Sequence, residues 1–382
     1  MNNINISRNN FLIDSDELNK LKKNMIETAE IIKKAVADKR FILIKHHDDT
    51  DGYTSGIVLE KAITPLIDDV RKQYYFSRSS SRYPYYDYTD SLRDLNNFLS
   101  FNSKKPLVIL CDLGSNEQSL RAIRRLMEFD VEFIIVDHHK YDEENKRLTK
   151  AFLNPHTVGL DSEYNAGMIA TELALFINPI LRGVKHLPGL SAVADRSSGK
   201  DVDKYVKISG YSFEELERWS LVIDHETYYL RFQARSKFLD SLFFPETIDK
   251  FMKMHKDIMK EFEKVEKAVK KYAKIKDYGK FKFISINRQD VGDYEYASSK
   301  LSRVLVDSIK EPRIAFVLTP GHISYRADGV DFKGVKLIDE LKQKFPHAMV
   351  NGGGHEVAGA IGFNVAANEE IMQYVDEFLN KI

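Results

Sequence analysis

Three short apolar runs in the first part of the chain each end in histidines or carboxylates. Residues 41–45, 106–111 and 131–136 suit buried strands, and helical patterns alternate with them at 16–38, 53–66 and 117–129. This alternation predicts an α/β domain with a doubly wound, mainly parallel sheet. Because the carboxyl ends of parallel strands meet at one edge, where open α/β sheets bind ligands, we expect a functional site at that edge.

The side chains that follow these runs predict a metal site. His47, Asp49 and Asp51 occupy alternate positions after the first run, and in an extended segment this spacing places them on one side. Asp112 follows the second run and His138 lies in the Asp-His-His that follows the third. Imidazole and carboxylate groups gathered in this way favour a divalent metal, and more than one ion.

The metal interpretation depends on the whole set. A lone aspartate at a strand end is more often a turn or capping residue, and a His-His pair is usually structural or exposed. Asp195 lies in an apolar, helix-like stretch, where an isolated carboxylate would be costly to bury, so it also needs a partner. Asp224-His225-Glu226 occupies a helical, aromatic-rich stretch with no strand before it, and we interpret it as structural.

Composition excludes some classes of protein. Hydrophobic residues make up 43% of the 382 residues, enough for two cores, and the 57 basic and 57 acidic residues give no net charge that would indicate a polyanionic partner. Cys111 is the single cysteine, so disulfides within the chain are excluded. No apolar stretch reaches the length needed to span a bilayer, and residues 1–10 lack a signal-peptide core. These features predict a cytoplasmic protein with no membrane contact.

The pattern of hydrophobic residues changes in the second half of the chain. Residues 213–276 carry long helical patterns, including an apolar stripe formed by Phe251, Met254, Ile258, Phe262, Val265, Val269 and Tyr272. Strand-like runs return from Phe281 onward, interleaved with helices, and predict a second, smaller α/β domain. We therefore expect a catalytic domain over 1–205, a helical connector over 206–276 and a second domain over 277–382.

The ordered motifs resemble the DHH phosphoesterase superfamily. The first motif of that family, His-x-Asp-x-Asp-Gly, matches residues 47–52, Asp112 matches the second, Asp137-His138-His139 the third, and Asp195 resembles the fourth. Asn351-Gly352-Gly353-Gly354-His355 is similar to the glycine-rich signature of the DHH-associated domain, and Ser324-Tyr325-Arg326 to the strand before it. The resemblance covers roughly 40–200 and 280–382.

The resemblance implies a two-metal phosphodiesterase. One ion would be held by His47, Asp49 and Asp112, and the other by Asp51, Asp112, His138 and Asp195, with Asp112 bridging. Asp137 would orient a histidine, and His139 would face the phosphate as charge stabiliser or general acid. Mixed histidine and aspartate ligation suits Mn²⁺ better than Mg²⁺, which remains possible. Hydroxide would attack phosphorus without a covalent enzyme intermediate. The substrate would be held in the second domain by Ser324, Arg326, Gly352, Gly353, Gly354 and His355.

Two features favour a nucleic-acid polymer as substrate. Residues 250–276 hold ten lysines against four acidic residues, a basic helix that suits a phosphate backbone, although such a face is usually only solvated. The stretch 74–88 mixes tyrosines with Arg78 and Arg82, as base-stacking surfaces do, although such a loop also fits simple packing. The chain then resembles the archaeal-type RecJ-like nucleases, which implies a single-strand exonuclease of DNA or RNA that releases mononucleotides.

Other functions and several details stay open. The alternatives are a small-substrate phosphodiesterase acting on oligoribonucleotides or cyclic dinucleotides, and a catalytically silent scaffold of a replication complex. The resemblance to a branch that works in DNA repair and replication implies a helicase or replisome partner, which the helical middle would contact. The choice between DNA and RNA, the polarity of digestion and the oligomeric state do not follow from the sequence.

Overall fold

A computed structural model describes residues 11–68, 70, 72–81, 83–101, 105–230, 237–292 and 298–382. The chain divides into two compact units, Met1–His255 and Lys256–Ile382, each of which is described by itself. Part of the predicted connector, residues 206–255, belongs to the first of these units. The division at 205 and 276 stays a prediction. None of the helices in the described ranges is long and apolar enough to cross a membrane.

The first unit contains the predicted parallel sheet. Its five strands run in the order β2-β1-β3-β4-β5, and every pair is parallel. The strands are β1 (Ile42–His47), β2 (Phe76–Ser81), β3 (Leu107–Cys111), β4 (Glu132–Val136) and β5 (Ala151–Leu153). The chain first adds β2 on one side of β1 and then β3 to β5 on the other, so the order reverses between β1 and β3. A sheet of this order binds its ligand at that reversal.

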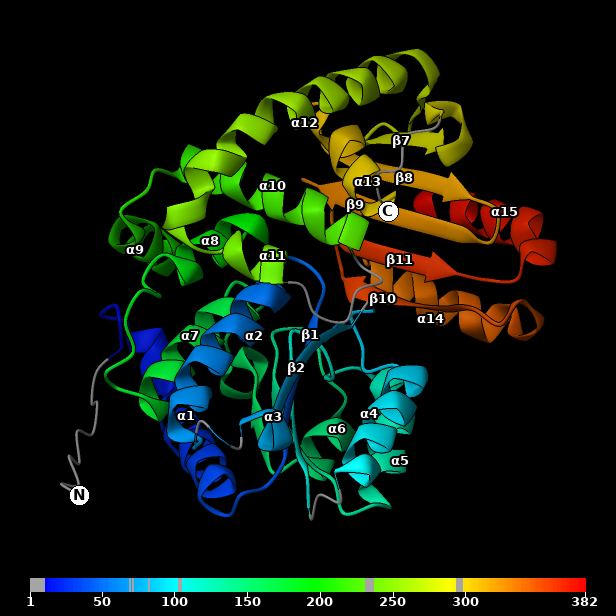
Figure 1. Ribbon diagram of the computed structural model, residues 1–382. Helices are drawn as coiled ribbons and strands as arrows, with labels where there is room; N and C mark the ends of the chain where they lie inside the picture. The colour runs from blue at the N-terminus through cyan, green and yellow to red at the C-terminus, as the bar shows by residue number, and fades with distance from the viewer. Residues whose placement is uncertain are drawn as a thin grey trace. The chain divides into compact units, whose positions relative to one another are not determined.

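Helices cover both faces of this sheet, as Figure 1 shows. Ile42 and Ile44 of β1 join a core with apolar residues of the first group of helices, whereas Phe41 and Leu43 join the core of the second group. The first group is α1 (Asp16–Ala37), α2 (Thr50–Ile63), α7 (Ala166–Ile177), α8 (Leu187–Ala194), α9 (Lys200–Ser209), α10 (Phe213–Leu230) and α11 (Lys237–Ser241), and the second is α4 (Tyr88–Ser100) and α5 (Leu120–Met127). The short helices α3 (Lys72–Tyr75) and α6 (Glu143–Leu148) complete the unit. The alternation along β1 follows from the two-residue period of a strand buried on both faces.

One long helix, α12 (Pro245–Tyr272), spans the boundary between the units. Ile248 packs against the core of the first unit, whereas Val265 and Val269 belong to a core of the second. Of the predicted apolar stripe, Ile258 is also buried, but Tyr272 is 41% exposed. The side chains of Phe251, Met254 and Phe262 lie outside the described residues.

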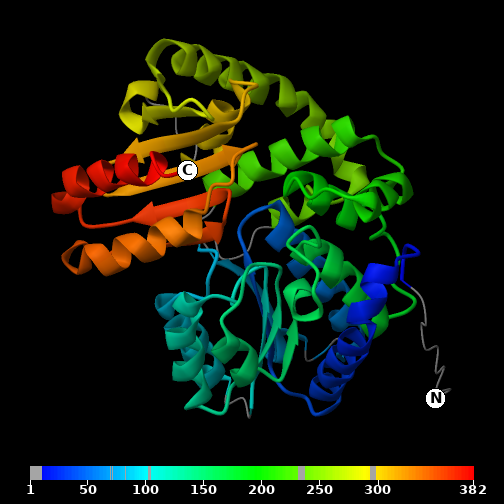
Figure 2. The ribbon, with the colours of Figure 1, turned by 180° about the vertical axis from the view of Figure 1, so that it is seen from behind.

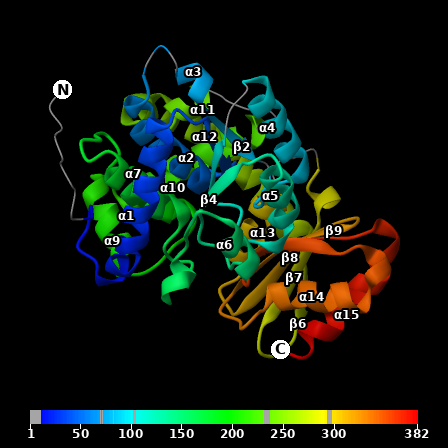
Figure 3. The ribbon, with the colours of Figure 1, turned by 90° about the horizontal axis from the view of Figure 1, so that it is seen from below.

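The second unit contains a six-stranded mixed sheet, seen from behind in Figure 2. Its order is β10-β11-β9-β8-β7-β6, with β7 and β8 parallel and the other pairs antiparallel. The strands are β6 (Lys274–Asp277), β7 (Lys282–Asn287), β8 (Arg313–Thr319), β9 (His322–Asp328), β10 (Asn351–His355) and β11 (Ala358–Gly362). One face packs on α14 (Gly334–Lys344) and α15 (Asn368–Leu379), which lie side by side in Figure 3, and the other on α13 (Ser298–Asp307) and the end of α12.

The Gly-Gly-Gly segment is a strand of this sheet. β10 pairs with β11 in register, and a Cβ at Gly352 would lie 2.4 Å from the carbonyl oxygen of Ala360. Gly354 has a φ of +121°, which L side chains rarely adopt, and a Cβ there would lie 2.6 Å from the carbonyl oxygen of Ala358. Glycine is therefore required at both positions by the close approach of two strands.

Candidate metal centre

The loop after β1 brings His47 and Asp49 together. Nδ1 of His47 lies 2.8 Å from Oδ2 of Asp49, and Oδ1 of Asp49 accepts a hydrogen bond from the amide of Gly52 (2.9 Å). Asp49 is thus the N-cap of α2. A Cβ on Gly52 would lie 2.3 Å from the carbonyl oxygen of His47, so only glycine permits this tight strand-to-helix turn.

The expected extended segment does not extend to Asp51. The strand ends at His47 and Asp51 lies in the first turn of α2, because the side chain of Asp49 caps the helix two residues earlier. The premise of an alternating, extended loop is therefore wrong, although the three side chains still gather at the predicted edge.

Asp51 is held by the N-terminus of α7. Its Oδ2 accepts from the amide of Ala166 (3.1 Å), and its Oδ1 accepts from the amide of Gly167 (2.6 Å) and the hydroxyl of Ser191 (2.5 Å). Unpaired amides at a helix N-terminus favour an anion, so this position fixes the carboxylate without neutralising it. Burial, reinforced by Asp112, raises the pKa of Asp51 well above its ordinary value. Gly167 and Ser191 carry no signal in the sequence that would link them to Asp51.

Asp112 lies between the two histidines that follow β1 and β4. Its Oδ2 is 3.4 Å from Nδ1 of His47, and its Oδ1 is 3.4 Å from Nε2 of His138. Asp112 is buried with a left-handed φ of +56°, and its Oδ1 has no hydrogen-bond partner among the described residues. A buried carboxylate oxygen without a hydrogen-bond donor is costly unless a cation approaches it.

His138 presents one nitrogen to the cluster. Its Nδ1 donates a hydrogen bond to the carbonyl oxygen of Ser162 (2.9 Å), and its Nε2 faces the carboxylates, 3.7 Å from Oδ2 of Asp51. A histidine ligand is usually oriented by such a bond from its other nitrogen. Asp195 lies nearby, with Oδ2 3.8 Å from Nδ1 of His138. The helix predicted to contain Asp195 ends at Ala194. Asp195 is therefore the C-cap of α8 and not an interior residue.

Two sets of donor atoms result. His47, Asp49 and Asp112 form one set and Asp51, His138 and Asp195 the other, and within each set the atoms lie within 4.8 Å of one another. A third set contains Asp112, Asp137, His138 and His139. Burial alone would lower the pKa of His47 and His138, but the surrounding carboxylates outweigh it and raise both pKa values well above the ordinary one. Such a concentration of negative charge suits a cation, and the donor chemistry fits two divalent ions.

Asp137 is engaged by its own neighbours. Its Oδ1 accepts from the amides of His138 (2.8 Å) and His139 (3.2 Å) and from Nδ1 of His139 (2.7 Å), while Oδ2 accepts from the amide of Ser115 (3.1 Å). Burial would raise the pKa of Asp137, but the charge and hydrogen bond of His139 outweigh it and hold the pKa far below its usual range. With four donors on its two oxygens, Asp137 is better placed to orient His139 than to bind a metal.

Known proteins are similar to this chain in sequence and in fold. Residues 41–185 match the DHH family, N-terminal domain. This part of the chain belongs to the DHH family. An uncharacterized protein of Methanocaldococcus jannaschii is 32% identical over 414 residues, which cover 95% of this chain and 54% of that protein. The chain thus spans about half the length of this curated relative.

Two solved structures show the same fold. The DHH domain of a member of a family of ribosomal proteins superposes with a TM-score of 0.90 and is 28% identical, covering 98% of this chain and 94% of that chain. RecJ from Thermus thermophilus in complex with Mn²⁺ gives a TM-score of 0.65 at 14% identity, covering 94% of this chain and 55% of that chain. The fold is therefore RecJ-like.

The predicted substrate-binding residues of this DHH protein lie in the second unit. Ser324 is buried and Arg326 half-buried on β9, and the three glycines and His355 are on β10. The strand register aligns Ser324 with Ala360 and Gly353, and Arg326 with Ala358 and His355. The side chain of His355 lies outside the described residues.

The tyrosine-rich stretch of the DHH unit is in large part structural. Phe76 and Arg78 are buried residues of β2, and buried Tyr86 donates a hydrogen bond to Asp94 (2.8 Å), so these three cannot stack on bases as predicted. Arg82 lies outside the described residues. The rings of Tyr83 and Tyr85 stack on each other with centroids 5.1 Å apart, and Tyr83 is 41% exposed.

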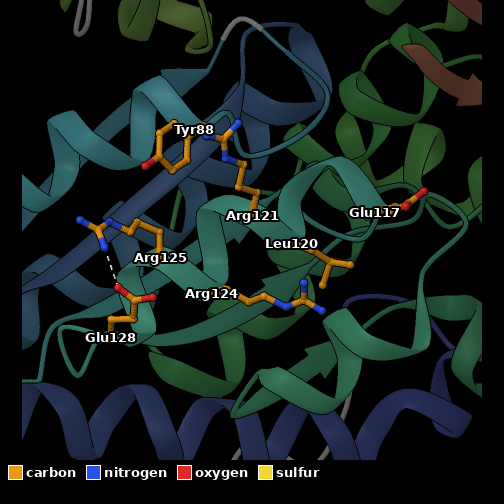
Figure 4. A pocket seen from close by; sticks show the side chains of 7 residues that line it. All are labelled: Tyr88, Glu117, Leu120, Arg121, Arg124, Arg125 and Glu128. Carbon is orange, nitrogen blue, oxygen red and sulfur yellow. Dashed lines mark hydrogen bonds and ion pairs between the residues drawn. The ribbon is translucent and has the colours of Figure 1, made fainter. Parts of the chain in front are cut away.

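A surface hollow on α4 and α5 lies beside this stretch (Figure 4). The guanidinium of Arg121 lies 4.1 Å above the ring of Tyr88. Arg124 pairs with Glu144 (2.5 Å), and Arg125 pairs with Glu128 (2.6 Å). Since two of its three arginines are neutralised, the hollow is not a strong anion site, and none of the metal donors clustered among the described residues lines it.

Asp224 has the structural role that the sequence indicates. It nevertheless lies close to the metal donors. Its Oδ1 accepts from the amide (3.2 Å) and the hydroxyl (2.7 Å) of Thr50, at the first residue of α2. Asp224 is absent from the donor sets found in the described part of the chain. It therefore fixes the helix that carries Asp51.

Proposed function

We propose that this DHH protein is a Mn²⁺-dependent exonuclease that hydrolyses single-stranded nucleic acid and releases mononucleotides. The observation that carries the proposal is the position of Asp112 between His47 and His138, at the reversal of strand order. One carboxylate there suits a bridge between two ions.

The donor sets support the ligands expected from the sequence. His47, Asp49 and Asp112 would hold one ion, and Asp51, Asp112, His138 and Asp195 would hold the other. Two bound ions would lower the pKa of a shared water and neutralise charge on the phosphate. Mixed histidine and aspartate donors favour Mn²⁺ over Mg²⁺, and the structural neighbour RecJ was solved with Mn²⁺ and also with Mg²⁺.

The protein's own groups would orient the substrate and stabilise charge. The Nδ1 of His139 is engaged by Asp137, so Nε2 is the atom that would donate to a phosphate oxygen or to the leaving group. Burial lowers the pKa of His139, but Asp137 outweighs it and raises the pKa above the ordinary value, which favours the protonated ring. Arg326 would grip a phosphate of the substrate from the second unit.

Two surface features support a polymeric substrate. On α12, the side chains of Lys253, Lys256, Lys260, Lys264, Lys267, Lys270 and Lys271 are exposed. Lysines in this number on one helix can follow a phosphate backbone. The exposed Tyr83, with Tyr88 beneath Arg121, offers aromatic surface for unpaired bases. A helicase or replisome partner belongs to the same proposal.

The test is a panel of end-labelled DNA and RNA oligomers of different lengths, incubated with Mn²⁺ or Mg²⁺. The proposal expects mononucleotide release in Mn²⁺, with activity maintained on long oligomers, and the position of the label reports polarity. Rates that fall steeply with chain length would instead indicate a small-substrate phosphodiesterase. Inert protein that binds no Mn²⁺ in metal analysis would contradict the proposal and favour a silent scaffold.

A further inference from the structure

A buried arginine of β2 contacts the histidine that precedes the metal loop. Arg78 is 3% exposed, and its Nη1 lies 2.9 Å from Nε2 of His46. Its Nε donates to Glu60 of α2 (2.6 Å), and its Nη2 donates to Asp240 of α11. The two carboxylates compensate the buried guanidinium and fix its orientation, because each takes a different edge of the planar fork.

These contacts determine the tautomer of His46. Arginine can only donate, so Nε2 of His46 must be the acceptor. Nδ1 of His46 lies 2.7 Å from the carbonyl oxygen of His47, which can only accept, so Nδ1 must carry the proton. His46 is therefore a neutral ring with one defined tautomer, in a pocket where a Cβ on Gly56 would lie 2.4 Å from its Cδ2.

The carbonyl of His47 is then held from two directions. His46 donates to it, and Gly52 lies so close that a Cβ would be 2.3 Å from the same oxygen. Fixing this carbonyl restrains the backbone of His47, whose imidazole lies between Asp49 and Asp112.

We propose that Arg78 is a positioning residue that acts through His46 on His47. Glu60 and Asp240 hold the guanidinium, the guanidinium selects the tautomer of His46, and Nδ1–H of His46 fixes the carbonyl of His47. This inference rests on the proposed function in one respect, the role of His47 as a metal ligand. Asp240 lies in the helical stretch that the sequence identifies only as a connector, so that stretch contributes to the metal centre.

Two substitutions of His46 distinguish a relay, meaning the chain of contacts from Arg78 through His46 to His47, from simple packing of the ring. The side-chain amide nitrogen of Asn takes the place of Nδ1 and still donates to His47, whereas the amide of Gln takes the place of Nε2 and contacts only Arg78. We expect His46→Asn to keep Mn²⁺ affinity close to that of the unmodified chain, and His46→Gln to weaken it about tenfold, as outer-shell changes do. Equal affinities for the two variants would overturn the relay.

The tautomer is measured directly in the metal-free full chain. Long-range ¹H–¹⁵N spectra should show a neutral, Nδ1-protonated histidine that disappears in His46→Gln. Asp240→Asn should broaden or shift this signal and lower Mn²⁺ affinity, and Arg78→Lys should do so more strongly. Arg93→Lys is the matched control, since Arg93 is exposed and pairs with Asp90 on α4, away from His46, and it should change neither quantity.

A failure of the proposed function and a failure of the positioning role of Arg78 would give different results. A chain that binds no Mn²⁺ would contradict the proposed function, while the spectra would still report whether Arg78 selects the tautomer. A tautomer and Mn²⁺ affinity unchanged in both Asp240→Asn and Arg78→Lys would overturn the positioning role of Arg78, even in an active nuclease.

Discussion

Oδ1 of Asp137 lies 2.7 Å from Nδ1 of His139, two residues along the chain, and accepts a hydrogen bond from this nitrogen. The same oxygen accepts the backbone amides of His138 and His139, so the carboxylate fixes both the turn after β4 and the ring that follows it. In the proposed function, this pairing would leave Nε2 of His139 for the substrate and would occupy Asp137 with hydrogen bonds in place of a metal.

Asp137→Asn tests this pairing. The amide lacks the charge that raises the pKa of His139, so this pKa should fall and the protonated ring that would stabilise the phosphate should be less populated. We expect kcat to fall about 10²-fold, with a much smaller change in Mn²⁺ affinity. Steady-state kinetics and calorimetric titration give the two quantities. Asp203→Asn, on the exposed side of α9, is the control, and a variant of Asp137 that loses Mn²⁺ and activity in equal measure would identify Asp137 as a ligand.

Asp112→Asn should separate stability from metal binding. In the metal-free chain the substitution removes one buried negative charge from a crowded set, so the melting temperature should stay unchanged or rise. Mn²⁺ affinity should fall by about two orders of magnitude, and the stoichiometry should drop below two, because the shared ligand is lost. Thermal melts in EDTA and in Mn²⁺ measure both effects. A variant that is less stable without metal but binds two ions normally would show that Asp112 is structural.

The metal-free protein should lose stability as the pH rises through about 6. Burial, with Asp112 and Asp49 adding to it against His138, raises the pKa of Asp195 to about 6, whereas an unfolded aspartate titrates near ~3.9. A raised pKa contributes stability that is present below the unfolded value and lost as the pH rises through the folded value. The full shift corresponds to on the order of 2–3 kcal/mol, and because the carboxyl of Asp195 is partly exposed, solvent screening keeps the loss below that value.

Melting in EDTA between about pH 4 and pH 8 measures this loss, and saturating Mn²⁺ should reverse it because the ion replaces the missing protons. Asp195→Asn should make the pH dependence in EDTA shallower, and the raised pKa values of Asp51, His47 and His138 should account for what remains. A metal-free chain that becomes more stable toward pH 8, equally in the variant, would contradict the assignment of Asp195 to the cluster.

The sequence predicts the parts of the fold whose signal is local. β1, β3 and β4 are apolar runs that end in the donor residues, and any parallel sheet places those ends together, so the site follows from the strands. β2 is not recognisable from its sequence because its buried Arg78 is neutralised by Glu60 and Asp240, partners 18 and 162 residues away. From the sequence alone, β2 with its arginine therefore looks like a basic surface segment and not like a buried strand.

The supports of the site are the least predictable part. Asp51 depends on Ala166, Gly167 and Ser191, which are more than 100 residues away, and none has a side chain that indicates a site by itself. Likewise, β10 consists largely of glycines whose strand conformation comes from pairing with β11. Ligands are thus readable from sequence when their chemistry is distinctive, whereas the residues that orient them become visible only in three dimensions.

Arg326→Lys tests the second unit as a binding element. The register places Arg326 in a row with Ala358 and His355 across three strands, so the neighbour of Arg326 on β11 is a small residue. Lysine keeps the charge but cannot make a bidentate contact, so we expect KM to rise about tenfold while kcat changes little, as when uniform binding is removed. The control is Arg288→Lys in the same unit, which should leave both constants unchanged. A fall in kcat at constant KM would instead place Arg326 beside the reacting phosphate, and unchanged constants would remove it from substrate binding.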